Sequence, residues 1–265
     1  MFVMTHNIMK NYSVSDDEWE AISSFFPQID RGVGRRRYSN RIVFEAMIAW
    51  LMDGLATRRC TRYLGVSYAT LSRRLNEWID ASVFERLWGE SISCYSDLVG
   101  LDLSRLLMDG AIVIAPNGGE ATGRNPTDRG KTGSKRSLCT EARGIPLSIA
   151  VSGANAGDRS LVAETLDTAM IDLPLAVILS LDAGYTGART RQIIMDRGLV
   201  CVVSSRAEPA SWLRSPIECA HSLFNRYRGL KVRVLRLASR WLASLQLAAA
   251  IITFRATSRG VLKPM

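Results

Sequence analysis

Acidic residues are missing from the last 47 residues of the chain, 219–265, although nine Lys or Arg lie there. The preceding residues balance, with 25 basic and 25 acidic side chains, so the whole formal charge of +9 arises in this final segment. The sequence pI is about 9.7. A surplus of one charge sign favours a polyanionic partner, either nucleic acid or an anionic membrane surface.

Histidine and paired cysteines are also scarce. The chain has two histidines, His6 and His221, and its five cysteines are dispersed without a CxxC pair. This pattern excludes a zinc finger and argues against a disulfide framework. The start of the chain lacks the apolar run of a signal peptide. We therefore expect a cytoplasmic, reducing setting.

Long apolar runs are absent too. The longest run, 241–254, has fourteen residues and lies between Arg240 and Arg255. A helix that spans a bilayer needs about 20 residues. The run is better interpreted as a buried helix, and no membrane partner is expected.

The N-terminal part has the pattern of a helical region. Ser15 and Glu18 form a capping box that opens an amphipathic helix, and Pro27 ends it. A connector rich in arginine follows. The next predicted helix, 42–52, is apolar nearly all round and closes at Gly54.

Residues 57–78 have the spacing of a helix-turn-helix. Gly65 supplies the turn, and Ser67 caps a second helix whose apolar residues recur along one inward face. A recognition helix of this kind enters the major groove of DNA. The residues predicted to bind DNA there are Tyr68, Thr70, Arg73 and Arg74. The alternative is an ordinary helical pair with a solvated face.

Short strands replace helices from about residue 100. Strands are predicted at 106–115, 137–140, 145–152, 175–181 and 199–205, with helices at 158–171 and 188–197. A tight turn joins the second and third strands, and strand–helix–strand units follow, so we expect an α/β protein with a mixed sheet flanked by helices. The predicted domains are a small all-α helix-turn-helix-like domain over 13–95 and the sheet domain over 100–258.

Two aspartates interrupt predicted strands that are otherwise apolar. Asp109 lies within the first strand, and Asp182 ends the fourth, at the strand edge where sites gather in such sheets. A buried carboxylate is costly unless it is paired or bound to a cation, so the two invite a shared ligand. Glu218, the last acid before the basic segment, is the third candidate.

Three carboxylates without histidine form a set of oxygen ligands. Such a set suits Mg²⁺ or Mn²⁺ rather than zinc, and it can hold two cations at a phosphate. In the alternative interpretation, Asp109 and Asp182 cap turns and Glu218 is a surface acid.

A glycine-rich, basic segment, 118–137, follows the first strand. Its basic side chains predict contacts with phosphates: Arg124, Arg129, Lys131, Lys135 and Arg136. The segment is not a Walker P-loop, because its GKT lacks the GxxxxGK spacing. No nucleotide cofactor is expected.

Taken together, these residues resemble bacterial insertion-sequence transposases of the DDE type. The likeness runs over nearly the whole chain and is most specific in 108–158 and in LDAGYTGARTRQIIMDRGL (181–199). The segments 14–27, 41–54 and 70–88 also resemble the helical DNA-binding region of that family. By this likeness, Asp109 and Asp182 match the family's two catalytic aspartates and Glu218 its glutamate. Arg214 matches the arginine of the family's tyrosine–arginine–glutamate signature. The resemblance implies an RNase H-like catalytic fold.

The chain departs from that family pattern near Glu218. Ser211 stands where a tyrosine is expected, and Asn225 stands where a basic residue is expected, so Arg226 or Arg228 would have to serve. The stretch before the glutamate is also short. A catalytically decayed copy that only binds DNA is therefore an alternative.

The resemblance also implies an activity and its partners. It implies metal-dependent cleavage at the ends of a DNA element, followed by strand transfer into target DNA through attack by the freed 3′-OH. Mg²⁺ or Mn²⁺ would be held by Asp109, Asp182 and Glu218. The partner is double-stranded DNA, with the backbone held by Arg214, Arg226, Arg228, Lys231 and Arg233, and synapsis of two ends implies at least a dimer. A non-mobile RNase H-like nuclease is a further alternative.

Overall fold

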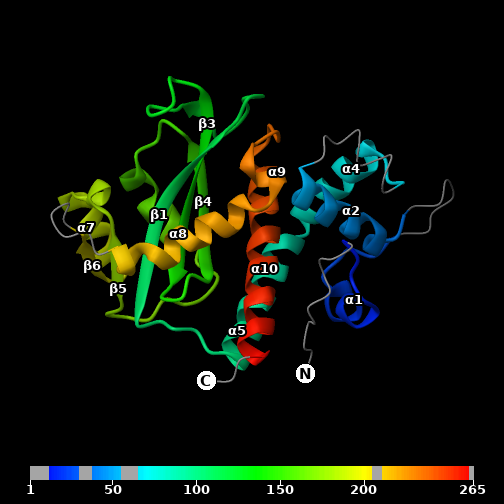
Figure 1. Ribbon diagram of the computed structural model, residues 1–265, viewed down its shortest axis with the longest axis horizontal. Coiled ribbons are helices and arrows are strands. Elements are labelled where there is room, and N and C mark those ends of the chain that lie inside the picture. Colours follow the sequence, from blue (N-terminus) through cyan, green and yellow to red (C-terminus); the bar gives the residue numbers. More distant parts are fainter. Residues whose placement is uncertain (1–11, 30–37, 55–64, 205–210, 263–265) are drawn as a thin grey trace.

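The computed structural model describes residues 12–29, 38–54, 65–204 and 211–262 (Figure 1). Side chains are described in these ranges apart from 211–215 and 261–262. A β-sheet lies on one side and the N-terminal helices on the other, with the long C-terminal helix between them (Figure 1). No helix in the described ranges is long and apolar enough to span a membrane.

The first two helices have the predicted caps, but the first ends at Ser23 rather than at Pro27 and the second begins at Asn40 rather than at Ile42. The capping box of α1 (Asp16–Ser23) is present: the Glu18 N–H donates to Ser15 Oγ, and the Ser15 N–H donates to the Glu18 carboxylate. Helix α2 (Asn40–Asp53) ends at Gly54, whose φ of 58° is the left-handed conformation that glycine adopts without strain.

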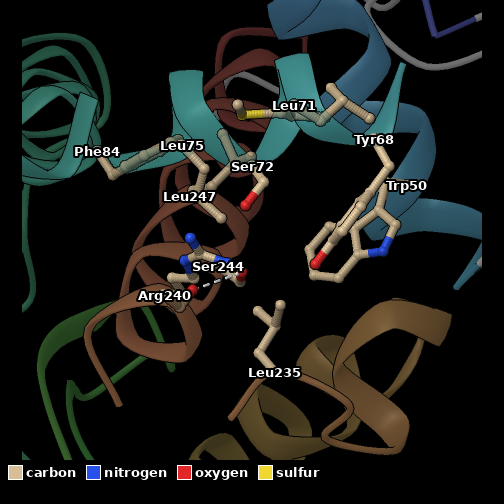
Figure 2. Close-up of a pocket in the computed structure, with 11 residues that line it drawn as sticks. Trp50, Tyr68, Leu71, Ser72, Leu75, Phe84, Leu235, Arg240, Ser244 and Leu247 are labelled. Atoms are coloured by element: carbon tan, nitrogen blue, oxygen red, sulfur yellow. Dashed lines mark hydrogen bonds between the residues drawn. The ribbon is translucent and has the colours of Figure 1, made fainter. Parts of the chain in front are cut away.

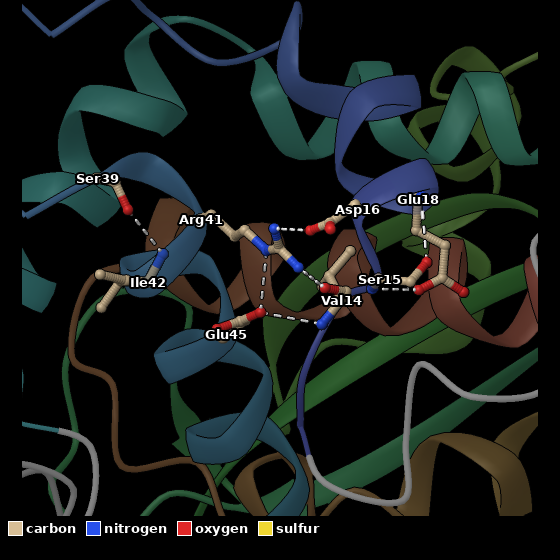
Figure 3. Close-up of polar contacts among 8 residues, drawn as sticks. All are labelled: Val14, Ser15, Asp16, Glu18, Ser39, Arg41, Ile42 and Glu45. Carbon is tan, nitrogen blue, oxygen red and sulfur yellow. Dashed lines mark hydrogen bonds and ion pairs between the residues drawn. The ribbon is translucent and has the colours of Figure 1, made fainter.

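Arg41 joins the start of α2 to the start of α1 (Figure 3). Its guanidinium pairs with Asp16, donates to the Val14 carbonyl and lies 3.4 Å from Glu45 Oε1. Glu45 in turn accepts a hydrogen bond from the Val14 N–H at 3.0 Å. One cation thus fixes how the chain enters α1 against the side of α2.

Helix α4 (Tyr68–Asp80) is the predicted second helix of the helix-turn-helix. Ser67 caps it as predicted, accepting from the Thr70 N–H at 3.2 Å, and Gly65 takes a positive φ of 68° in the turn. The predicted first helix lies in 55–64, outside the described residues. Trp78 anchors α4 in an aromatic cluster, with its ring 4.8 Å from that of Phe26.

The sheet is mixed, as predicted. Its strands are β1 (Arg105–Ile114), β2 (Gly123–Arg124), β3 (Thr132–Glu141), β4 (Pro146–Gly153), β5 (Ile178–Leu181) and β6 (Val200–Val203). They are ordered β2-β3-β1-β5-β6, with β4 also paired to β3. The β1–β3 and β3–β4 pairs are antiparallel, whereas β5 is parallel to both β1 and β6. Three antiparallel strands followed by two parallel ones give the RNase H-like sheet, so the predicted fold class is confirmed.

Helices cover both faces of this sheet. Successive side chains of a strand point to opposite faces, and β3 shows this directly. Arg136 contacts α8 (Ser211–Asn225), while Ser137 accepts a hydrogen bond from Thr165 of α6 (Val162–Asp167). Figure 1 shows α8 crossing one face of the sheet. One face of the sheet is therefore covered by α8 and the opposite face by α6.

The C-terminal helix connects the sheet with the N-terminal helices. Helix α10 (Ala238–Leu262) packs along α5 (Val83–Leu98) and also against β4 (Figure 1). The remaining short elements are η1 (Asp158–Leu161), η2 (Ala183–Tyr185), α7 (Ala188–Met195) and α9 (Arg228–Lys231). One hydrophobic core cluster includes residues of α2, α5, the sheet and α10. The division into two domains near residue 95 stays a prediction.

Candidate metal-dependent active site

Asp109 and Asp182 come together at one edge of the sheet. Strands β1 and β5 run parallel, and their register pairs Leu107 with Ser180. Two residues further along the two strands stand Asp109 and Asp182. Asp109 lies within β1, whereas Asp182 follows directly after the end of β5, where its backbone is still extended. Continued by two residues, the register would pair the two aspartates, and side chains at paired positions point to the same face.

That face is the one covered by α8. In the antiparallel register of β1 with β3, Asp109 pairs with Leu138, and Leu138 is two residues from Arg136. Side chains two residues apart share a face, and the Arg136 guanidinium contacts α8. Asp109 and Asp182 therefore point toward the helix that carries Glu218.

Both aspartates are also anchored locally. Asp109 Oδ1 accepts a hydrogen bond from the Gly110 N–H at 2.8 Å, and Asp182 Oδ1 accepts one from the Gly184 N–H at 2.8 Å. Asp182 thereby caps η2, so the turn-capping interpretation holds for it. A carboxylate has two oxygens, and one can fix the side chain while the group still serves as a ligand.

Tyr185 lies among three carboxylates. Burial raises the pKa of its hydroxyl above the usual range, and the negative charges of Asp158, Asp109 and Asp182 raise it further. The ring is only 1% exposed. Asp158 is thus a third acid beside the two aspartates, and nothing in the sequence patterns had singled it out.

Asp158 is balanced by a buried lysine. Lys135 Nζ lies 2.9 Å from Asp158 Oδ1 and donates to the Ala156 carbonyl at 2.7 Å. A Cβ at Gly110 would come within 2.3 Å of Asp158 Oδ1, so the carboxylate lies directly against the main chain beside Asp109. The ion pair therefore lies on the α6 face of the sheet, opposite the face to which Asp109 points.

Glu218 is exposed on α8, on the same side of the sheet as the two aspartates. Among the described residues, no three His, Cys, Asp or Glu side chains lie close enough to hold a metal ion together. Asp109 and Asp182 each lie two residues beyond the registered pair Leu107–Ser180. Glu218 lies on the facing helix and forms no compact triad with them. The side chain of Arg214 lies outside the described residues.

The residues fit a hard divalent cation in part. Two adjacent, half-buried carboxylates supply the oxygen donors that Mg²⁺ or Mn²⁺ prefers. The fit rests on Asp109 and Asp182, with Glu218 as the candidate that approaches from α8.

Four basic residues that the sequence predicts to bind DNA are buried, and the contacts described for them lie within the protein. Arg74 is 3% exposed and pairs with Glu77, and Lys135 is held by Asp158. Arg136 and Arg233 are 0% and 1% exposed. The Arg233 guanidinium donates to the Ala121 carbonyl and lies over the Trp241 ring, so it fixes the C-terminal segment to the loop after β1.

Other predicted DNA-binding residues are open to solvent. Arg73 and Tyr68 are exposed on α4 and Thr70 is half-buried, while the exposed basic residues near the sheet are Arg124, Arg129, Lys131, Arg226, Arg228 and Lys231. Lys131 pairs with Asp128 at 3.1 Å. These side chains can reach a phosphate without unfolding, and their role stays a prediction.

Helix α4 contacts α10 along one side. An apolar pocket between them is lined by Trp50, Leu71 and Leu235, with Tyr68 at its wall (Figure 2). At its edge, Arg240 Nε donates to Asn76 Oδ1 at 2.9 Å. The helix predicted to read DNA is therefore fastened to the C-terminal helix along part of its polar face.

Comparison with known proteins identifies relatives of the chain. Residues 14–88 match the family model described as transposase of IS4/5 family. The chain is 32% identical over 150 residues to a transposase for insertion sequence element IS402 of Burkholderia cepacia, which covers 52% of this chain and 71% of the relative. A 16.2 kDa protein of insertion element IS402 from the same organism is 27% identical over 118 residues, covering 43% and 80%.

Solved structures offer only a weak likeness. The Mos1 mariner paired-end complex with Mn is 13% identical, with a TM-score of 0.37 over 94% of this chain and 83% of that one. A score this low carries no argument about the site. The family is shown instead by a sequence relative that is 32% identical and matched over 71% of its length. The chain therefore belongs to the insertion-sequence transposases.

Proposed function

We propose that this transposase cleaves the ends of its DNA element and joins them to target DNA at a divalent-metal site formed by Asp109, Asp182 and Glu218. The observation that supports the proposal is the register of β1 with β5, because Asp109 and Asp182 each lie two residues beyond its last pair, Leu107 and Ser180. Both point toward α8, where Glu218 lies. A family that moves DNA needs a site for phosphodiester chemistry, and this carboxylate pair supplies one.

Each residue of the site has a defined task in this proposal. Asp109 and Asp182 hold the cation, fixed by their hydrogen bonds to Gly110 and Gly184. Glu218 approaches from α8 and completes the ligand set. When bound, Mg²⁺ or Mn²⁺ supplies charge stabilisation at the phosphate and activates the attacking oxygen. The carboxylates form no covalent bond to DNA, since positioning and charge stabilisation carry the reaction.

Exposed cations hold the DNA backbone in this account. Lys131, Arg226, Arg228 and Lys231 lie on the glycine-rich segment and on the chain just after Glu218. The exposed residues Tyr68 and Arg73 of α4, with Thr70, contribute the contacts that recognise the element's end. The partner is double-stranded DNA, and pairing of two ends calls for at least two copies of the chain.

The experiment is metal-dependent nicking of a labelled duplex that carries the element's terminal sequence. With Mg²⁺ the native protein should nick the duplex, and Asp109→Asn should not, while both bind the duplex equally. The matched control is Asp97→Asn, which removes an exposed carboxylate on α5 and should leave nicking unchanged.

The result that overturns the proposal is nicking by Asp109→Asn at the native rate. A second outcome favours a different function: end-specific binding by the native protein, with no nicking in Mg²⁺ or Mn²⁺. That outcome would make the chain a DNA-binding protein without catalysis. Its structural basis would be the missing third ligand, because Glu218 does not form a compact triad with the aspartates.

A further inference from the structure

Arg136 is a fully buried cation whose hydrogen-bond partners are all uncharged. It is 0% exposed, at the centre of β3, and its guanidinium donates to His221 Nδ1 at 3.3 Å, to the His221 carbonyl at 3.3 Å and to Asn225 Oδ1 at 3.1 Å. Its charge also lies 5.0 Å from the centre of the Phe224 ring. Every one of these partners belongs to α8. The side chain therefore holds one helix against the sheet.

Burying a guanidinium without a carboxylate is costly. Burial lowers the pKa of Arg136 to about 10, so the side chain still carries its charge at neutral pH. An apolar residue could fill the same space with less desolvation. Unlike an apolar residue, Arg136 forms directional hydrogen bonds to α8, because a planar guanidinium donates only in fixed geometry. It sets both the position and the rotation of α8.

The residues that Arg136 grips lie in line with Glu218. Glu218, His221 and Asn225 are at positions i, i+3 and i+7, and so they share one face of α8. His221 also contacts the main chain of Asp109. Its ring thus lies between the buried arginine and the strand that carries the first aspartate.

We infer that Arg136, acting through His221 and Asn225, is the positioning residue that orients toward the aspartate pair the face of α8 that carries Glu218. This inference rests on the proposed metal site. Arg136 points to the same face of the sheet as Asp109, and the face of α8 that it grips carries Glu218 one turn from His221. Without the hydrogen bonds from Arg136, α8 would slide or rotate. Glu218 would then move, while both aspartates stayed in place.

The test is binding of Mn²⁺ to the intact protein, measured by electron paramagnetic resonance without DNA. Residues that orient metal ligands typically change metal affinity about 10–100-fold when replaced, and Arg136→Met should weaken Mn²⁺ binding within that range. Ser222→Ala, an exposed site on α8, is the control and should bind Mn²⁺ as the native protein does. Arg136→Lys keeps the charge but cannot reach both acceptors, so it should also bind weakly.

A double-variant cycle separates positioning from general stability. If Arg136 acts through Glu218, then Arg136→Met combined with Glu218→Gln binds Mn²⁺ no more weakly than Glu218→Gln alone. Fully additive losses, or native affinity in Arg136→Met, would overturn the inference. If Arg136→Met does not fold, Arg136→Lys takes its place in the cycle and the same outcomes decide. If the native protein binds no Mn²⁺, the proposed metal site is contradicted, and with it the function that Arg136 is inferred to serve.

Discussion

At the scale of single residues, buried cations organise this protein more than exposed ones do. Arg74, Lys135, Arg136 and Arg233 are all buried. The last three bind other parts of the chain, whereas Arg74 pairs with Glu77 of its own helix. In the sequence these residues look like candidates for phosphate contacts, because a basic residue in a polar segment usually faces solvent. Their burial follows from tertiary contacts that no local pattern records. The aspartates were predictable because each interrupts an apolar strand.

The buried ion pair of Lys135 with Asp158 should contribute measurably to stability. Lys135→Met leaves Asp158 without its partner, and removing one member of a buried pair is destabilising. Asp158 is 35% exposed, which reduces the loss, so we expect the free energy of unfolding to fall by about 1–3 kcal/mol. Urea denaturation measures it.

The control for that prediction is Lys131→Met. Lys131 pairs with Asp128 at the surface, where an ion pair contributes only about 0–1 kcal/mol. If Lys131→Met and Lys135→Met lose the same free energy of unfolding, the buried pair stabilises the protein no more than the surface pair does.

At the scale of elements, helices with clear caps were predicted well and strands less so. The cap residues Ser15, Ser67 and Gly54 act as predicted. Strand β3, however, is ten residues long rather than four, because its polar half pairs with β1 and is buried there. Strand β5 is shorter than predicted, since its pairing with β1 begins only at Ile178. Pairing partners set strand ends, and a single sequence does not reveal them.

Gly54 tests how tightly α2 packs on α9. An alanine Cβ there would lie 2.8 Å from the Arg228 carbonyl carbon, and the φ of 58° adds strain. Gly65→Ala is the matched variant, with a φ of 68° and, among the described residues, no atom within 4 Å of its Cβ. Overpacking costs about 1–3 kcal/mol, so thermal denaturation should show Gly54→Ala to be less stable than Gly65→Ala by that amount. If the two variants lose equal stability, the contact with α9 is not tight.

At the scale of the whole molecule, the C-terminal helix packs against both the N-terminal helices and the sheet, which the sequence suggests are separate domains. Helix α10 was predicted as a buried helix, and it is one, but its main partner is α5, about 150 residues earlier in the chain. Such long-range packing cannot be read from one sequence. Because of this packing, the helical region and the sheet share one continuous hydrophobic core.

The molecule should therefore unfold in a single step. Near-ultraviolet circular dichroism reports on the aromatic cluster around Trp78, and far-ultraviolet dichroism reports on the whole chain. We expect the two thermal transitions to coincide. Trp241→Ala, which removes a side chain of α10 that is 1% exposed, should lower both midpoints together. Two separated transitions would instead indicate independently folding domains divided near residue 95.

The central claim is that Asp109 and Asp182 act as one unit at the metal site. Its most direct test is the single-turnover rate of end cleavage in Mg²⁺ for Asp109→Asn, Asp182→Asn and the double variant. Groups that act as a unit are strongly non-additive, so each single variant should lose on the order of 10³-fold or more, and the double variant should lose little beyond that. Near-native cleavage by either single variant would contradict the account.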